Sequence, residues 1–154
     1  MHFVVVADLV VAGFLVGANA WFFFIQSPAL IAIMGRDKFV PLQMRLTKLL
    51  FQNLSTAALL LVVFAWLAGP SGAILGASIA AIAALIAQFA IIPRALKAGG
   101  KGRIETMAEG GDNSVGKFAS EGSGPSAEFW HRTVVVFVGL VLIGAVINID
   151  GIVR

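Results

Sequence analysis

The chain has 154 residues, of which 59% are hydrophobic and only 12% are charged, and its formal net charge is +3. Soluble domains carry about 25% charged residues, so this composition excludes an ordinary soluble fold and indicates a single membrane domain. The absence of cysteine excludes disulfides, thiolate metal sites and thiol catalysis. A net charge this small gives no support for a nucleic-acid partner.

The first predicted span covers residues 3–25. About 20 apolar residues cross a hydrocarbon core of ~30 Å, and a helix satisfies its own backbone hydrogen bonds there. Ala18-Asn19-Ala20 matches a signal-peptide cleavage site, but no basic residue precedes the apolar run and Asp8 lies inside it. We therefore interpret the segment as a retained transmembrane helix.

Two faces are predicted on this first helix. At about 100° per residue, Asp8, Asn19 and Gln26 lie near one line. We expect this line to face the bundle interior, because an ionisable group in lipid costs at least ~2.5 kcal/mol. Gly13 and Gly17 lie on the opposite face in a G-x-x-x-G pattern, which is typical of close helix packing. The first helix is therefore expected to contact one neighbour on each face.

Two prolines frame the connection to the second span. Pro28, after Ser27, is predicted to kink or end the first helix, because proline has no N–H to donate. Pro41 suits the first turn of a new helix. We expect this helix to lie partly in the headgroup region and then to cross the bilayer as residues 49–67.

The third predicted span, residues 73–92, follows a Gly-Pro turn at residues 69–70 and stops at Pro93. Small residues recur at every fourth position at its start, a pattern that favours helix packing. These packing positions are Gly72, Gly76 and Ala80.

Polar side chains in the first three spans are open to two interpretations. They either line a polar pocket in the cytoplasmic half of the bundle or form hydrogen bonds between helices, which average only ~0.6 kcal/mol each. The amides of this set are Asn19, Gln26, Gln52, Asn53 and Gln88.

The fourth predicted span covers residues 129–149 and follows a glycine-rich loop, residues 94–128. Every Lys and Arg except Arg154 lies in that loop, in the connection 26–48, or at a helix border. The positive-inside rule therefore predicts that both connections are cytoplasmic and that both termini are outside, in a bacterial inner membrane.

His2 and His131 are predicted at opposite ends of the bundle, ~30 Å apart, so they cannot share a haem iron. The sequence contains no other cluster of metal ligands and specifies no cofactor. We interpret His131, beside Trp130, as an interfacial anchor or a hydrogen-bonding group at the start of a helix. A binding site at the cytoplasmic mouth is the alternative.

The motif Phe22-Phe-Phe-Ile-Gln-Ser-Pro28, followed by Gly35-Arg36 and by Phe129-Trp-His131, resembles the transmembrane-protein-205-like family. That resemblance implies a small four-helix membrane fold and no settled biochemistry. The membrane enzymes of glutathione and eicosanoid metabolism are similar only in layout. Their helix-two arginine, asparagine and glutamate motif is missing here, and no Glu precedes Glu105.

The predicted fold is therefore all-α: a four-helix transmembrane bundle with an interfacial helix before the second span and a Gly-rich cytoplasmic loop before the fourth. The leading hypothesis is a non-enzymatic structural or accessory subunit that packs with itself or with a larger complex in the lipid bilayer. The second is a small proton- or ion-linked transporter or channel that uses Asp8 and the intramembrane amides. The third is a membrane enzyme with His131 as acid or base, for which no nucleophile–base pair is evident, so no catalytic residue is assigned.

Overall fold

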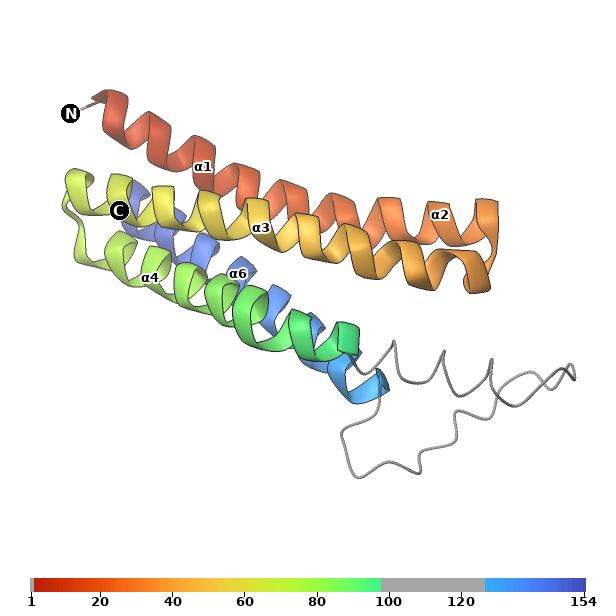
Figure 1. Cartoon of the computed structure of the whole chain (residues 1–154). Helices are drawn as coiled ribbons and strands as arrows, with labels where there is room; N and C mark the ends of the chain where they lie inside the picture. Colours follow the sequence, from red (N-terminus) through yellow and green to blue (C-terminus); the bar gives the residue numbers. More distant parts are fainter. Residues whose placement is uncertain (1, 98–126) are drawn as a thin grey trace, which may run out of the picture.

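The structure, a computed structural model, describes residues 2–97 and 127–154, apart from the side chains of residues 36–38, 40, 41, 44, 127, 128 and 131. Four of its helices are long and apolar enough to cross a membrane, which confirms the predicted all-α, four-span architecture (Figure 1). Most of the predicted glycine-rich loop falls on residues 98–126, outside the described residues. The four candidate spans are His2–Met34, Arg45–Ala68, Ser71–Lys97 and Arg132–Val153.

The first helix continues through Pro28 instead of ending there. It consists of α1 (His2–Ala20), a π-helical turn η1 (Trp21–Gln26) and α2 (Ser27–Met34). At the end of η1, the Ser27 N–H bonds to the Phe22 carbonyl five residues earlier, and Ser27 Oγ donates to the same oxygen at 2.7 Å. The extra residue in a π turn changes which carbonyls need a donor, so the helix passes the proline without breaking.

The next helix, α3 (Arg36–Ala68), starts earlier than Pro41. Gly35 adopts φ 77° and ψ 161°, which reverses the chain, and the Phe39 N–H then donates to the Gly35 carbonyl at 3.1 Å. Pro41 therefore lies inside α3, and the segment predicted to lie in the headgroup region forms the first turns of this helix. Glycine is needed at residue 35, because this backbone region is essentially closed to other residues.

The third helix also passes its proline by a π turn. Gly69, in the left-handed region at φ 96°, ends α3, and α4 (Ser71–Ile86) begins after Pro70. The π-helical turn η2 (Ala87–Ile91) follows, and helical residues 92–97 include Pro93. The predicted stop at Pro93 is thus replaced by the same device that precedes Pro28.

The four helices form a closed ring in which each packs mainly against two neighbours. The last helix, α6 (Ala127–Val153), packs mainly against α4, and α4 packs also against α3. The first helix α1 lies between α3 and α6. Figure 1 shows these antiparallel neighbours and places the N- and C-termini at the same end of the bundle. All seven buried residues of α4 are alanine or glycine, so the backbone of this helix can lie close to its neighbours.

The first hairpin is longer than a bilayer is thick. Residues His2–Met34 and α3 each comprise 33 residues, about 50 Å of helix, against ~30 Å of hydrocarbon. Its α2 end extends beyond the described ends of the other two helices (Figure 1). The second hairpin, formed by α3 and the helix that starts with α4, aligns two arginines. Arg45 lies 24 residues before Gly69 and Arg94 lies 24 residues after Pro70, so the two residues lie at the same height along the antiparallel helices.

Candidate functional site

Glycines clasp α4 and α6 together near the end of the bundle that carries the termini. A Cβ atom on Gly76 would lie 2.6 Å from the Gly144 carbonyl oxygen and 2.8 Å from the Asn148 Cα, both in α6. A Cβ on Gly151 would lie 2.5 Å from the carbonyl carbon of Gly72. These spacings leave no room for a side chain, so the two backbones touch directly. We call this contact of Gly72 and Gly76 in α4 with Gly144 and Gly151 in α6 the glycine clasp.

The clasp presents Asn148 to both neighbouring helices. Its Nδ2 donates to the carbonyl oxygen of Ala73 in α4 at 3.2 Å and to Oδ1 of Asp8 in α1 at 3.4 Å. Asp8 and Asn148 are both 0% exposed. One amide from the last helix therefore connects three of the four helices through a single buried polar cluster, which we call the Asp8–Asn148 pair.

Two oxygen atoms of this pair have no hydrogen-bond partner. They are Oδ2 of Asp8 and Oδ1 of Asn148. The orientation of the Asn148 amide is determined by its neighbours, because Asp8 Oδ1 and Ala73 O are both acceptors and only the NH₂ group can donate to them. Buried polar atoms normally find partners, so two orphaned acceptors on adjacent side chains mark a site that lacks a donor.

The helices packed against Asp8 bring no charge to it. No charged residue occurs in residues 49–68 of α3, 71–92 of α4 or 133–149 of α6. The buried carboxyl group therefore has no charged neighbour from these segments.

The ionisable groups near the termini point elsewhere. Arg154 Nε pairs with Asp150 Oδ1 at 2.9 Å, and both side chains are mostly exposed. His2, in the first turn of α1, is also exposed. The polar partner of Asp8 at this end is therefore Asn148, and Arg154 pairs with Asp150 instead.

The predicted polar residues do not converge on one pocket. Asn19 is buried in α1, but it follows Asp8 by 11 residues, about 16 Å along the axis, and its Nδ2 donates to the Leu15 carbonyl at 2.7 Å. Gln26 and Gln88 are half-buried, and Gln88 Oε1 has no partner.

The two amides predicted in the second span lie on the outside of the bundle. Gln52 and Asn53 are both exposed on α3, and Asn53 Nδ2 donates to the Leu49 carbonyl at 3.0 Å. Of the five amides predicted to line an interior pocket, Asn19 alone is fully buried.

Gly13 and Gly17 lie on an open face of α1. A Cβ at either position would meet nothing within 4 Å. A groove of about 360 Å³ borders this face, lined from α1 and α3 by Val10, Val11, Phe14, Asn53, Thr56, Ala57 and Leu60. Val10 and Phe14 are 65% and 52% exposed. By contrast, Gly72, Gly76 and the buried Ala80 lie against α6. We call Gly13 and Gly17, together with the groove between α1 and α3, the α1/α3 face.

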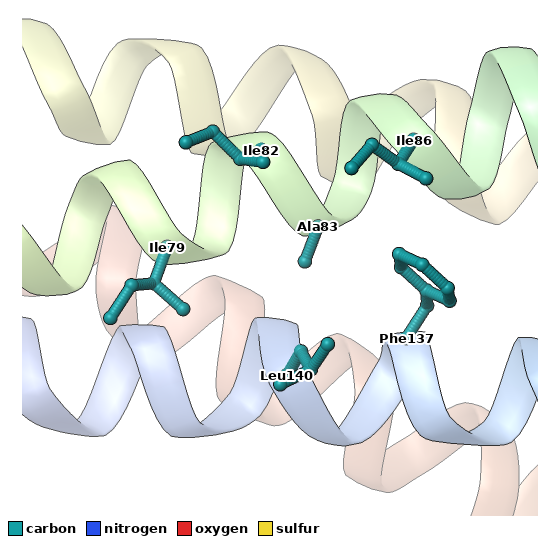
Figure 2. A pocket seen from close by; sticks show the side chains of 6 residues that line it. All are labelled: Ile79, Ile82, Ala83, Ile86, Phe137 and Leu140. Carbon is teal, nitrogen blue, oxygen red and sulfur yellow. The ribbon is translucent and has the colours of Figure 1, made fainter.

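A second groove on the bundle is entirely apolar. Figure 2 shows side chains from α4 and α6 around it, and none carries a polar group. They are Ile79, Ile82, Ala83, Ile86, Phe137 and Leu140. This groove offers apolar contacts suited to lipid chains and no group for chemistry.

Sequence reasoning missed Asn148, the residue at the centre of the buried cluster. The sequence did contain a signal for it. Asn148 is the one amide among residues 133–149 of the fourth span, and the glycines that flank it, Gly144 and Gly151, indicate a close helix contact at its position. His131 lies in α6, but its side chain is outside the described residues, so its predicted roles remain predictions.

A family profile described as a domain of unknown function, DUF4149, matches residues 10–103, more than half of the chain. The chain belongs to the DUF4149 family. The match in this DUF4149 protein includes most of α1, all of α3 and α4, and ends before α6. No curated protein and no solved structure matches the chain.

Proposed function

We propose that this DUF4149 protein is a structural membrane component that assembles with a second copy of itself through the α1/α3 face. The observation that carries the proposal is the exposure of Asn53, an amide of this face, within the apolar span Arg45–Ala68. Asn53 lies eight residues beyond Arg45, about 12 Å along the helix, and its short side chain cannot reach the membrane surface.

A second copy of the chain suits this face chemically. Lipid tails offer no hydrogen bonds, so an exposed amide in the hydrocarbon is stabilised by a protein partner. An asparagine or glutamine side chain both donates and accepts, so the same amide on a two-fold related copy is complementary to it. Gly13 and Gly17 add an open stripe of α1 that lets a neighbouring helix approach closely.

The experiment is site-directed disulfide cross-linking in native membranes, which is direct because the natural chain has no cysteine. Val10→Cys places the thiol on the α1/α3 face, whereas Leu75→Cys places it on the exposed outside of α4. We expect a cross-linked dimer from Val10→Cys and none from Leu75→Cys. Equal cross-linking at both positions, or none at either, contradicts the proposed interface.

A matched pair of substitutions tests the contacts themselves. Gly13→Leu fills the open stripe, and Gly139→Leu adds the same side chain to α6 at a position that also has nothing within 4 Å. The double variant Gly13→Leu/Asn53→Leu is expected to shift the mass of the protein in mild detergent from dimer to monomer. Gly139→Leu is expected to leave the dimer intact, and a wild-type monomer in native membranes refutes the assembly.

Proton- or ion-linked transport is a second candidate function, favoured by one observation, the full burial of Asp8 without a facing charge. Under this hypothesis, Asp8→Asn abolishes a pH- or ion-dependent flux in liposomes. A flux that is unchanged in this variant removes Asp8 from any transport mechanism.

We also propose that the basic connections face the cytoplasm of a bacterial cell and that the protein is related to the transmembrane-protein-205-like proteins. The level position of Arg45 and Arg94 supports one basic end of the bundle. Protease or label accessibility at the termini in cells whose outer membrane has been permeabilised tests this orientation, since both termini are then reachable from the periplasmic side.

A further inference from the structure

We propose that the Asp8–Asn148 pair is a proton-binding site, in which one proton on Asp8 Oδ2 is shared with Asn148 Oδ1. This inference is independent of the assembly proposed above, because the pair lies inside the bundle, on the side of α1 opposite Gly13 and Gly17. It rests on the two orphaned oxygens and on the amide orientation.

The hydrogen-bond inventory of the pair is short by one donor. With an ionised Asp8, the two side chains offer four oxygen and nitrogen atoms, of which only Asn148 Nδ2 donates, and it already serves Asp8 Oδ1 and Ala73 O. Binding one proton turns Asp8 Oδ2 from an acceptor into a donor. Asn148 Oδ1 is the acceptor that this donor requires, so one proton satisfies both orphaned atoms.

The bound pair then resembles the cyclic dimer of a carboxylic acid and a primary amide, with one hydrogen bond in each direction. The existing bond from Asn148 Nδ2 to Asp8 Oδ1, at 3.4 Å, is one half of that ring. Protonation supplies the other half, O–H to amide oxygen. No bond to carbon forms or breaks, and the proton comes from water at the end of the bundle that carries the termini.

Among residues 2–97 and 127–154, no charged side chain lies in the parts of the helices that pack against the pair. The spans packed against Asp8 carry no charged residue, as described above, and the titratable groups at this end are exposed: His2 on α1, and Asp150 with Arg154 on α6. Asp150 and Arg154 already pair with each other at 2.9 Å. The proton is therefore the simplest positive charge that the site can take, with a small metal cation as its competitor.

Infrared spectroscopy of the full-length protein tests the proposal without any variant. The detergent is a maltoside, which has no carbonyl group to obscure the signal. At pH 7 exposed carboxyl groups, with ordinary pKa values of about 4, are ionised, so a carbonyl stretch of a protonated carboxylic acid reports a buried site. We expect this band at pH 7, and its absence overturns the proposal.

Three variants assign the band. Asp8→Asn, which mimics the neutral acid in shape, should keep the helix content and remove the band. Asn148→Leu should keep the band but move its frequency, because the carboxylic acid loses its amide partner. Asp150→Asn, at the exposed carboxyl of the same end, should change nothing, and a band that survives in Asp8→Asn overturns the assignment.

Titration with salts separates a proton from a metal cation. The band is expected to be the same in sodium, potassium and choline chloride at pH 7. Loss of the band on replacing choline with sodium or potassium overturns the proton site in favour of a metal-cation site made of the same oxygens.

Discussion

Gly76→Ala tests whether the glycine clasp holds α4 and α6 together. The added methyl group would meet three backbone atoms of α6: the Asn148 nitrogen, the Gly144 oxygen at 2.6 Å and the Asn148 Cα at 2.8 Å. None of these can rotate away as a flexible side chain can. The two helices must therefore move apart, by at least the difference between 2.6 Å and an ordinary contact of 3.4 Å.

The expected cost follows from that separation. Overpacking of a close contact costs about 1–3 kcal/mol. A gap of about 0.5–1 Å also removes a quarter to a half of the dispersion energy of the atom pairs along the seam. Replacing glycine by alanine in a helix stabilises by roughly 0.5–1 kcal/mol, because the unfolded chain becomes less flexible. The separation also lengthens the hydrogen bond from Asn148 Nδ2 to the carbonyl oxygen of Ala73.

Gly13→Ala is the matched control, because it carries the same gain in helix stability and meets nothing within 4 Å. The difference between the two variants isolates the steric cost, about 1–3 kcal/mol. Unfolding in mixed micelles of increasing dodecyl sulfate content measures it, with the fluorescence of the three tryptophans as the signal. Equal free energies of unfolding for Gly76→Ala and Gly13→Ala would refute the clasp.

Two further predictions concern the turns. Gly35→Ala should destabilise the protein by about 1–3 kcal/mol in the same unfolding assay, because φ 77° with ψ 161° is closed to alanine. Gly69→Asn should cost clearly less than Gly69→Ala, since φ 96° and ψ −22° lie in the left-handed region that asparagine tolerates. Equal effects of the two substitutions at residue 69 would contradict this account of the turn.

Composition and apolar length were sufficient to predict four membrane-spanning helices, because lipid accepts apolar side chains on every outward face. Which face of each helix is buried could be predicted only as far as the helix kept about 3.6 residues per turn. In α1 the predicted interior line holds at Asp8 and Asn19, which are both buried. Beyond the π turn η1, the buried residue is Ser27, and Gln26, which a constant pitch places on that line, is only half-buried.

The same phase shift occurs in the third helix. The buried positions keep ordinary helical spacing through Ala84 and Ala87, but the next buried position is Ile92, five residues after Ala87. One extra residue in a turn rotates all that follows by about 100°. Nothing in the local sequence except the following proline indicates that turn, so the buried positions that follow Phe22 and Ala87 could not be derived from spacing alone.

Asn148 was missed for a different reason. A single amide at the end of an apolar span has no periodic partner on its own helix. Its role depends on Asp8, which is 140 residues away in the sequence, and on glycines that bring α4 close enough for its backbone to take part. Such a contact is a property of the assembled bundle.

The glycine clasp between α4 and α6 cannot form until the last helix of the chain has been synthesised. Ribosomes release α1, α3 and α4 before α6, and at least the 29 residues from 98 to 126 are synthesised between the two clasped helices. During that interval Gly72 and Gly76 of α4 have no partner helix from their own chain, and Asp8 lies in the membrane without its partner Asn148. A chain that terminates before α6 would therefore leave both exposed, and membrane proteases that survey unassembled spans would have a target in every unfinished copy.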